Sequence, residues 1–218
     1  MWGQRPILDV YVITSAGLVP GRGHADLALA AVEGGATAVQ LRAPELDDEE
    51  LWAVARELAP RVRERGVLFI VNDRVEVALQ SGADGVHLGQ DDVSEVASAR
   101  RGRLVLGFSV ESSDQARAAE EMEADYLGVT VWASATKPEA RPVGLEGLRS
   151  IVAATSLPVV GIGGVNPANA AEVITAGAAG VAAVSAVGGA PDPVAATRAL
   201  VEAVRTARLT RSTEEEAR

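Results

Sequence analysis

The sequence predicts an α/β protein with a single (β/α)8, or TIM, barrel, and three observations predict it. Short apolar runs occur eight times along the chain, at intervals of about 20–30 residues. Amphipathic stretches with helical periodicity lie between these runs. The length of 218 residues fits one compact domain. A doubly wound open sheet is the alternative, but it seldom needs eight strands in so short a chain.

The eight apolar runs are nearly continuous and rich in β-branched residues, which is typical of parallel strands covered on both faces. Aromatic residues make up only 3% of the chain, so the core must consist mainly of Ala, Val, Leu and Ile. We predict strands over Ile7–Thr14, Ala38–Arg42, Leu68–Asn72, Gly85–Leu88, Val105–Ser109, Tyr126–Trp132, Val159–Ile162 and Val181–Ser185.

The intervening stretches carry helix signals. Asp47 and Asp48 suit the start of a helix, and Pro60 predicts a kink or break near Ala59. Pro167 after Asn166 marks another helix start. We predict helices over Asp48–Arg65, Ser112–Met122, Leu145–Ala154, Pro167–Ala176 and Asp192–Arg208. The barrel is expected to span residues 1–208, and residues 209–218 form a polar tail that is expected to fray.

Composition and charge exclude several classes of protein. The chain has no cysteine, which excludes disulfides, thiolate metal sites and a cysteine nucleophile. The net charge of −10 argues against nucleic-acid binding through a basic surface. The N-terminus lacks a signal-peptide core, and no apolar run reaches the roughly 18 residues of a membrane span. We therefore expect a cytoplasmic protein with no nucleic-acid or membrane partner, whose anionic ligands would be bound by locally placed groups.

Polar residues and glycines follow the predicted strands. In such barrels the active site forms at the C-terminal ends of the strands, so these residues should share one rim. They are Gln40 and Arg42 after the second strand, Asn72, Asp73 and Arg74 after the third, Gly89, Gln90, Asp91 and Asp92 after the fourth, Ser109 at the end of the fifth, Ser134, Thr136 and Lys137 after the sixth, Gly163 and Gly164 after the seventh, and Ser185 at the eighth.

Carboxylates on two adjacent strands indicate a metal site. Asp73, Asp91 and Asp92 could supply two carboxylates, and Mg²⁺ usually takes one or two together with substrate phosphate. The alternative is that these residues cap the following helices. Because they share a rim, we favour the metal for Asp73 and Asp92.

Two segments could bind phosphate. Gly163-Gly164 and the Val184-Ser185-Ala186 turn fit the phosphate site that is common after strands seven and eight, although a tight turn into a helix is the alternative. The segment from Ser134 to Lys137 offers hydroxyls and an ammonium group for a second phosphate, or forms a solvated loop. Arg42 could bind phosphate too, or pair with a neighbouring carboxylate such as Asp73.

The chain has two histidines, and neither predicts catalysis. His87 lies within a strand, where a buried, hydrogen-bonded structural role is favoured. His24 begins a helix and is expected to be exposed. General acid–base chemistry by histidine is therefore not indicated.

Taken in order, these motifs resemble thiamine phosphate synthase (thiamine-phosphate pyrophosphorylase). The resemblance runs from about Tyr11 to Arg208. Its most specific parts are the Asn-Asp, Gly-Gln-Asp-Asp and Thr-Lys pieces. The motifs are Gln40-Leu41-Arg42, Asn72-Asp73-Arg74, His87-Leu88-Gly89-Gln90-Asp91-Asp92, Thr136-Lys137, Pro142-Val143-Gly144-Leu145-Glu146-Gly147-Leu148, Gly161-Ile162-Gly163-Gly164 and Val184-Ser185-Ala186.

The resemblance implies a transferase that joins hydroxymethylpyrimidine diphosphate to hydroxyethylthiazole phosphate, or its carboxylated form, and releases diphosphate. Asp73 and Asp92 would hold Mg²⁺, while Ser109 and Lys137 would be the catalytic residues. A homodimer is expected by resemblance alone. The remaining substrate-binding residues would be Gln40, Arg42 and Asn72 with Lys137 for the diphosphate or pyrimidine, and Ser134, Thr136, Gly164, Val184 and Ser185 for the thiazole phosphate.

The chain departs from the family pattern at two places. Pro44 stands where the family usually has a lysine, and the segment from Val129 to Lys137 lacks two prolines and carries Trp132. Two alternatives stay open: a thiazole tautomerase, which typically loses the carboxylates and uses a histidine near the place of Glu111, and a non-catalytic sensor of thiamine precursors. Another phosphate-binding barrel, such as a phosphoribosyl isomerase, would share only the Gly163-Gly164 site.

Overall fold

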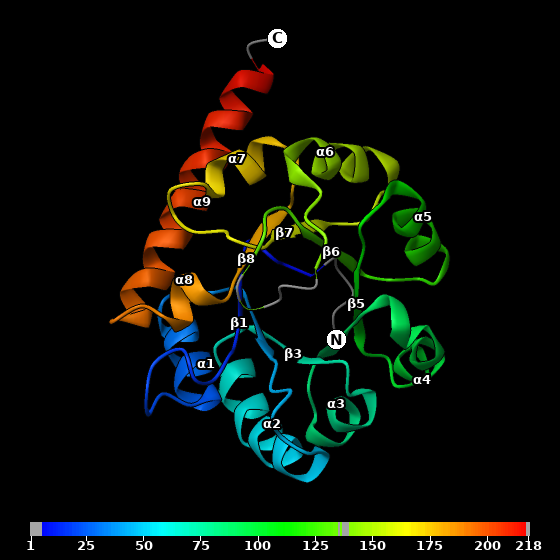
Figure 1. Cartoon of the computed structure of the whole chain (residues 1–218), viewed down its shortest axis with the longest axis vertical. Helices are drawn as coiled ribbons and strands as arrows, with labels where there is room; N and C mark the ends of the chain where they lie inside the picture. The colour runs from blue at the N-terminus through cyan, green and yellow to red at the C-terminus, as the bar shows by residue number, and fades with distance from the viewer. Residues whose placement is uncertain (1–5, 135, 137–139, 217–218) are drawn as a thin grey trace.

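The computed structural model describes residues 6–134, 136 and 140–216 as a closed barrel of eight parallel strands. Each strand pairs with the next in chain order, and the first pairs with the last, which closes the barrel (Figure 1). The strands are β1 (Val10–Ile13), β2 (Ala38–Leu41), β3 (Leu68–Asn72), β4 (Gly85–Leu88), β5 (Val105–Ser109), β6 (Tyr126–Thr130), β7 (Val159–Ile162) and β8 (Gly180–Ala183).

Helices surround the barrel as an outer ring (Figure 1). They are α1 (His24–Glu33), α2 (Asp48–Arg63), α3 (Val75–Ser81), the 3-10 helix η1 (Gln90–Glu95) with α4 (Val96–Arg101), α5 (Ser113–Glu121), α6 (Gly144–Ala154), α7 (Ala170–Thr175), α8 (Ser185–Gly188) and α9 (Pro193–Glu216). This arrangement confirms the predicted fold class and all eight strand positions, with some strand ends one to three residues from those predicted.

The observed helix ends agree with the sequence prediction at some positions and differ at others. Asp47 caps α2 through a hydrogen bond from the Glu50 N–H, as the acidic pair indicated. The helix continues through Pro60 to Arg63, so the break expected at that proline does not occur. Helix α9 continues to Glu216, eight residues beyond the end expected from the sequence.

Helix α7 begins at Ala170 rather than at Pro167. The preceding residues form a hydrogen-bonded turn in which the Asn166 side chain accepts from the Ala168 N–H at 2.9 Å. The Asn169 side chain in turn accepts from the Asn166 N–H at 2.8 Å. Asparagine side chains compete with helical hydrogen bonds in this way, which explains the later start.

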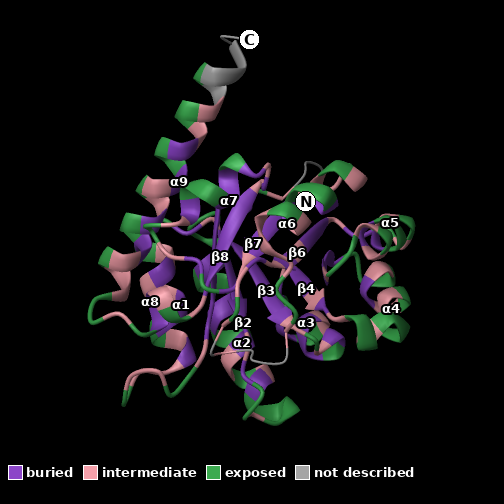
Figure 2. Ribbon diagram, turned by 45° about the horizontal axis from the view of Figure 1, so that its top comes forward, coloured by how far each residue is buried: buried purple, intermediate pink, exposed green. Residues whose placement is uncertain are grey.

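Strand residues alternate between two hydrophobic cores. Val10 and Val12 face the layer between strands and helices, whereas Tyr11 and Ile13 belong to the smaller cluster inside the barrel. Figure 2 shows the strands buried and the helices exposed on their outer faces. Because the period of a strand is two, each strand also delivers every second side chain to the barrel interior. Within the described part of the chain, no helix has both the length and the apolar character needed to cross a membrane.

Candidate active site

Two adjoining cavities open at the C-terminal ends of the strands. The first comprises about 760 Å³ of space between protein atoms, part of which is open to solvent. The second lies beside it, and the two share seven lining residues: Arg42, Asn72, His87, Ser109, Gly128, Thr130 and Ala140. They therefore form one continuous site.

Most of the residues expected at the rim line these cavities. The first cavity is lined by Gln40, Arg42, Asn72, Ser109, Ser134, Thr136 and Val184. Asp73 and Asp92 line the second, together with Arg42, Asn72 and Ser109. Gly164 and Ser185 line neither cavity, although their neighbours Gly163 and Val184 line the first. Lys137 lies outside the described residues.

The carboxylate of Asp73 is held by its neighbours on β3 and β4. Its backbone lies in the left-handed region at φ 60°, which is uncommon outside glycine but several-fold enriched in aspartate. Its N–H donates to the His87 carbonyl at 2.9 Å, and its Oδ2 accepts from Asn72 Nδ2 at 2.6 Å. These contacts fix both the Asn72 amide and the Asp73 carboxylate beside the second cavity.

Asp92 has a local role as well as a place in the cavity. Its Oδ2 accepts from the Gly89 N–H at 2.9 Å and so caps η1, which is the structural alternative that the sequence left open. Among the described residues, no group of three or more His, Cys, Asp or Glu side chains could hold a metal. A cation here would therefore depend on the two carboxylates and on oxygen atoms of a ligand.

Arg42 lies at the end of a hydrogen-bonded network at the rim. Its N–H donates to Thr14 Oγ1 at 3.2 Å, and that hydroxyl lies 2.8 Å from His24 Nδ1. His24 Nε2 lies 2.6 Å from a carboxylate oxygen of Glu45, in the loop that follows Arg42. Burial opposes ionisation of Glu45, but the hydrogen bond and the charges of His24 and Arg42 outweigh it and lower the pKa of that carboxyl.

The expectation that His24 is exposed is wrong, because its side chain is only 7% exposed. It does begin a helix, α1, as expected. Its two hydrogen-bond partners come from the ends of other strands, and a sequence pattern around the histidine does not reveal them.

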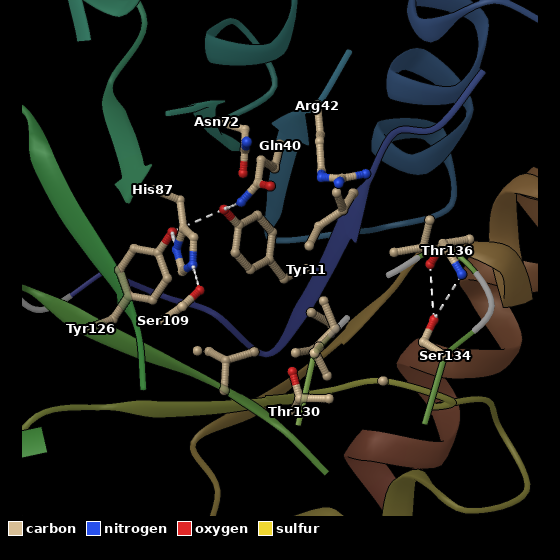
Figure 3. A pocket seen from close by; sticks show the side chains of 18 residues that line it. Tyr11, Gln40, Arg42, Asn72, His87, Ser109, Tyr126, Thr130, Ser134 and Thr136 are labelled. Atoms are coloured by element: carbon tan, nitrogen blue, oxygen red, sulfur yellow. Dashed lines mark hydrogen bonds between the residues drawn. The ribbon is translucent and has the colours of Figure 1, made fainter. Parts of the chain in front are cut away.

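A second network crosses the interior of the barrel. Gln40 Nε2 donates to the Tyr11 hydroxyl at 2.7 Å, and the hydroxyls of Tyr11 and Tyr126 lie 2.9 Å apart. His87 Nδ1 lies 3.0 Å from the Tyr126 hydroxyl, and its Nε2 lies 2.9 Å from Ser109 Oγ (Figure 3). The hydrogen bonds expected for His87 are confirmed, but the residue is half-buried rather than buried, and its ring lines both cavities.

Sequence reasoning missed the two tyrosines of this network. Tyr11 and Tyr126 stand in apolar runs and resemble ordinary core aromatics. The signal was their alternation: Tyr11 lies two residues before Ile13, and Tyr126 two before Gly128, and all four line the first cavity. Burial raises the pKa of both phenols, so both stay protonated.

Glycines on the neighbouring strands make room for these rings. A Cβ on Gly107 of β5 would lie 2.1 Å from Cζ of Tyr126 and 2.5 Å from Nδ1 of His87. A Cβ on Gly128 of β6 would lie 3.0 Å from Cε1 of His87. Only a residue without a side chain therefore fits beside the imidazole at position 107.

The Gly163-Gly164 turn lies directly after β7. Both residues have positive φ, 86° and 65°, and a Cβ on Gly163 would lie 2.3 Å from the carbonyl oxygen of Trp132. The Asn169 side chain donates to the Gly164 carbonyl at 3.0 Å, which holds the turn. Across the cavity mouth, Ser134 Oγ and Thr136 Oγ1 lie 2.9 Å apart (Figure 3).

Comparisons with known proteins place the whole barrel in one group. The profile of the family described as thiamine monophosphate synthase matches residues 10–187. Thiamine-phosphate synthase of Moorella thermoacetica is 49% identical over 207 residues, which cover 93% of this chain and 99% of that protein. Thiamine-phosphate synthase of Methanoregula boonei is 46% identical over 206 residues, covering 92% and 95%. The solved thiamine phosphate pyrophosphorylase from Pyrococcus furiosus superimposes with a TM-score of 0.85 at 43% identity, over 93% of this chain and 98% of that one.

Proposed function

Because this chain belongs to the thiamine monophosphate synthase family, we propose that it joins hydroxymethylpyrimidine diphosphate to hydroxyethylthiazole phosphate, or to its carboxylated form, and releases diphosphate. The carboxylated form would lose CO2 as well. One structural observation supports the proposal independently of family membership. Seven of the residues expected to bind substrate line a single cavity, and the expected carboxylates line the cavity beside it. Two ligands that react with one another need such a shared site.

The polar side chains of the barrel interior suit the pyrimidine. Gln40 and Asn72 offer amide groups, and Ser109 offers a hydroxyl, at the C-terminal ends of three strands. A pyrimidine with an exocyclic amine has both donors and acceptors on its edge, so amides and hydroxyls can complement it. Ser109 lines both cavities and would face the reacting part of the pyrimidine.

Mg²⁺ fits the donor set of the second cavity. Asp73 and Asp92 each have one carboxylate oxygen in a hydrogen bond described above, and both groups line that cavity. Two carboxylates with substrate phosphate are a usual ligand set for Mg²⁺. When bound, the ion would neutralise charge on the departing diphosphate. Arg42, which lines both cavities, would add a fixed positive charge on the same side.

The thiazole phosphate would lie at the other side of the first cavity. Ser134 and Thr136 supply two hydroxyls, and Gly163 and Val184 supply the wall after β7 and β8. Gly164 and Ser185 directly follow Gly163 and Val184 in the sequence. Their backbone N–H groups could donate hydrogen bonds to a phosphate only at the rim of the cavity.

The chemistry asks for orientation more than for a strong base. Departure of diphosphate leaves a positively charged pyrimidine methylene, which the thiazole nitrogen attacks. The chain would hold the two rings in contact and stabilise the leaving group, while Ser109 fixes the pyrimidine. No proton has to be removed from the attacking nitrogen, so the proposed step needs no histidine as a base.

The direct test is turnover with both substrates and Mg²⁺. We expect thiamine phosphate to form, and we expect Asp73→Ala to lower kcat/KM by about 100-fold or more. Asp114→Ala, which removes an exposed carboxylate of α5 paired with Arg117, is the control and should leave turnover unchanged. Binding of either substrate without product would contradict the synthase and favour the tautomerase or the sensor.

Lys137 can be tested separately because it is the only lysine in the sequence. An amine-selective reagent therefore modifies one side chain besides the chain terminus. We expect the pyrimidine diphosphate to slow modification of Lys137, measured by mass spectrometry, whereas the pyrimidine alcohol without diphosphate should not. Equal protection by both compounds would contradict a role for Lys137 at the diphosphate. A homodimer stays a prediction from the family resemblance.

A further inference from the structure

Five side chains from five strands form one continuous hydrogen-bonded chain across the barrel. It begins at Gln40 on β2, passes through the hydroxyls of Tyr11 and Tyr126 and through both ring nitrogens of His87, and ends at Ser109 (Figure 3). The four links measure 2.7, 2.9, 3.0 and 2.9 Å. Both ends of the chain line the first cavity.

Each inner member of this chain has one proton to give. The two phenols are fully buried, and burial raises the pKa of each, so neither loses its proton. A neutral imidazole carries one N–H and one acceptor nitrogen. If every link is made, all donors along the chain must therefore point the same way.

Two directions satisfy every link. In the first, Gln40 donates to Tyr11, Tyr11 to Tyr126, Tyr126 to His87 Nδ1, and His87 Nε2–H to Ser109. In the second, all these donors are reversed, and the Gln40 amide is turned so that its oxygen accepts from Tyr11. An interruption at Tyr11 or Tyr126, which are buried, would leave a buried hydroxyl short of a hydrogen bond, which is costly.

The direction decides what the two ends offer to a ligand. In the first direction the Gln40 oxygen faces the cavity as an acceptor, and the Ser109 hydroxyl is left to donate. In the second direction Gln40 presents its NH2 group, and Ser109 has used its proton on His87. The hydrogen-bonded chain therefore offers a ligand either an acceptor at Gln40 and a donor at Ser109, or a donor at Gln40 and an acceptor at Ser109.

We propose that Tyr11, Tyr126 and His87 are positioning residues that couple Gln40 to Ser109, so that the two ends recognise a pyrimidine as one unit. The proposal rests on the proposed function for the identity of the ligand. An aminopyrimidine that places its amine against Gln40 and a ring nitrogen against Ser109 matches the first direction at both ends. This ring nitrogen is N1, across the ring from the amine. A 4-oxo analogue carries its proton on N3 and leaves N1 as an acceptor, so it matches each direction at one end only.

Two compounds without diphosphate test the coupling: 4-amino-5-hydroxymethyl-2-methylpyrimidine and its 4-oxo analogue. The protein has only two histidines, so ¹⁵N labelling of histidine gives two rings to assign. At a pH near 8, above the ordinary titration range of histidine, we expect the amino compound to fix His87 as the Nε2–H tautomer. The 4-oxo compound should shift His87 toward the Nδ1–H tautomer. His24, whose partners lie outside this chain, is the internal reference.

Tyr11→Phe separates coupling from mere structural support. It removes one hydroxyl, disconnects Gln40 and leaves the link from Tyr126 to Ser109 in place. The amide can then turn alone, so the ratio of the two Kd values, measured by calorimetry, should fall about five- to tenfold. His87 should keep the Nε2–H tautomer with both compounds. Thr37→Val, which removes a hydroxyl bonded to the Val10 backbone, is the control and should keep the wild-type ratio.

The outcomes separate this inference from the proposed function. Equal weakening of both compounds in Tyr11→Phe, or an Nδ1–H tautomer in the amino complex, would overturn the coupling while turnover with the full substrates continued. If the wild-type protein bound neither pyrimidine and formed no thiamine phosphate, the proposed function would fail, and the coupling with it.

Discussion

The two histidines lie in networks that differ in how they end. The rim network of His24 ends at Glu45, an ionised carboxylate that only accepts hydrogen bonds. The interior network of His87 ends at Ser109, a hydroxyl that both donates and accepts. A neutral His24 must therefore carry its proton on Nε2 and donate a hydrogen bond to the carboxylate. His87 can instead carry its proton on either ring nitrogen with both of its hydrogen bonds made. The same residue type thus serves a fixed contact in one region and a reversible one in the other.

The largest expected effect comes from closing the space around the interior network. Gly107→Ala places a methyl group 2.1 Å from Tyr126 and 2.5 Å from His87, so the rings must move. We expect the free energy of unfolding to fall by about 1–3 kcal/mol, and the Tyr126 to His87 hydrogen bond to be lost. Denaturant unfolding measures the first and the ¹⁵N spectrum of His87 the second.

Gly128→Ala is the graded comparison for that variant. Its added methyl group would lie 3.0 Å from His87 Cε1, and the rings have to yield far less. It should therefore destabilise the protein less than Gly107→Ala does. If the order were reversed, ring crowding would not be the cause of the loss.

Tyr126→Phe removes a hydroxyl while keeping the ring. It leaves Tyr11 and His87 each with one hydrogen bond fewer inside the barrel. We expect a loss of about 1–2 kcal/mol in the free energy of unfolding, because a buried polar group without its partner keeps its desolvation cost. Chemical denaturation at neutral pH measures it, and an unchanged midpoint would mean that water replaces the lost partner.

The smallest effect concerns the rim network and depends on pH. The folded-state pKa of Glu45 lies below its ordinary value of 4.5, so its contribution to stability is present above that pH and is lost as the pH falls through the lower folded value. Glu45→Gln should destabilise the protein by less than about 1 kcal/mol at pH 7, since the carboxylate is half exposed. The difference from wild type should shrink in thermal unfolding as the pH falls below 4.5, and a constant difference would exclude the charge as its cause.

The positions of the strands could be predicted because parallel strands covered on both faces must be nearly continuous apolar runs. Helix starts were less predictable, as at Asn166, whose side chain forms a local turn instead of starting a helix. The polar rim followed from the fold, because residues such as Asn72 and Ser109 end their strands.

The interior network was harder to predict than the rim. Tyr126 stands among apolar residues, and nothing beside it in the sequence names His87 or Tyr11 as a partner. Those partners come from other strands, so only the register of the closed barrel brings them together. His24 was misjudged for the same reason, since Thr14 and Glu45 reach it from elsewhere in the chain.

Because Gly107 lies close to Tyr126, the residues that evolution can accept at one of these positions depend on the residue at the other. A larger residue at position 107 is tolerable only if the residue at position 126 becomes smaller and the His87 ring moves into the space that this leaves. Such epistasis predicts that Gly107→Ala is harmful in the wild-type background and less harmful beside Tyr126→Val. Among relatives, any sequence that has lost this tyrosine is the place to look for a side chain at the glycine position.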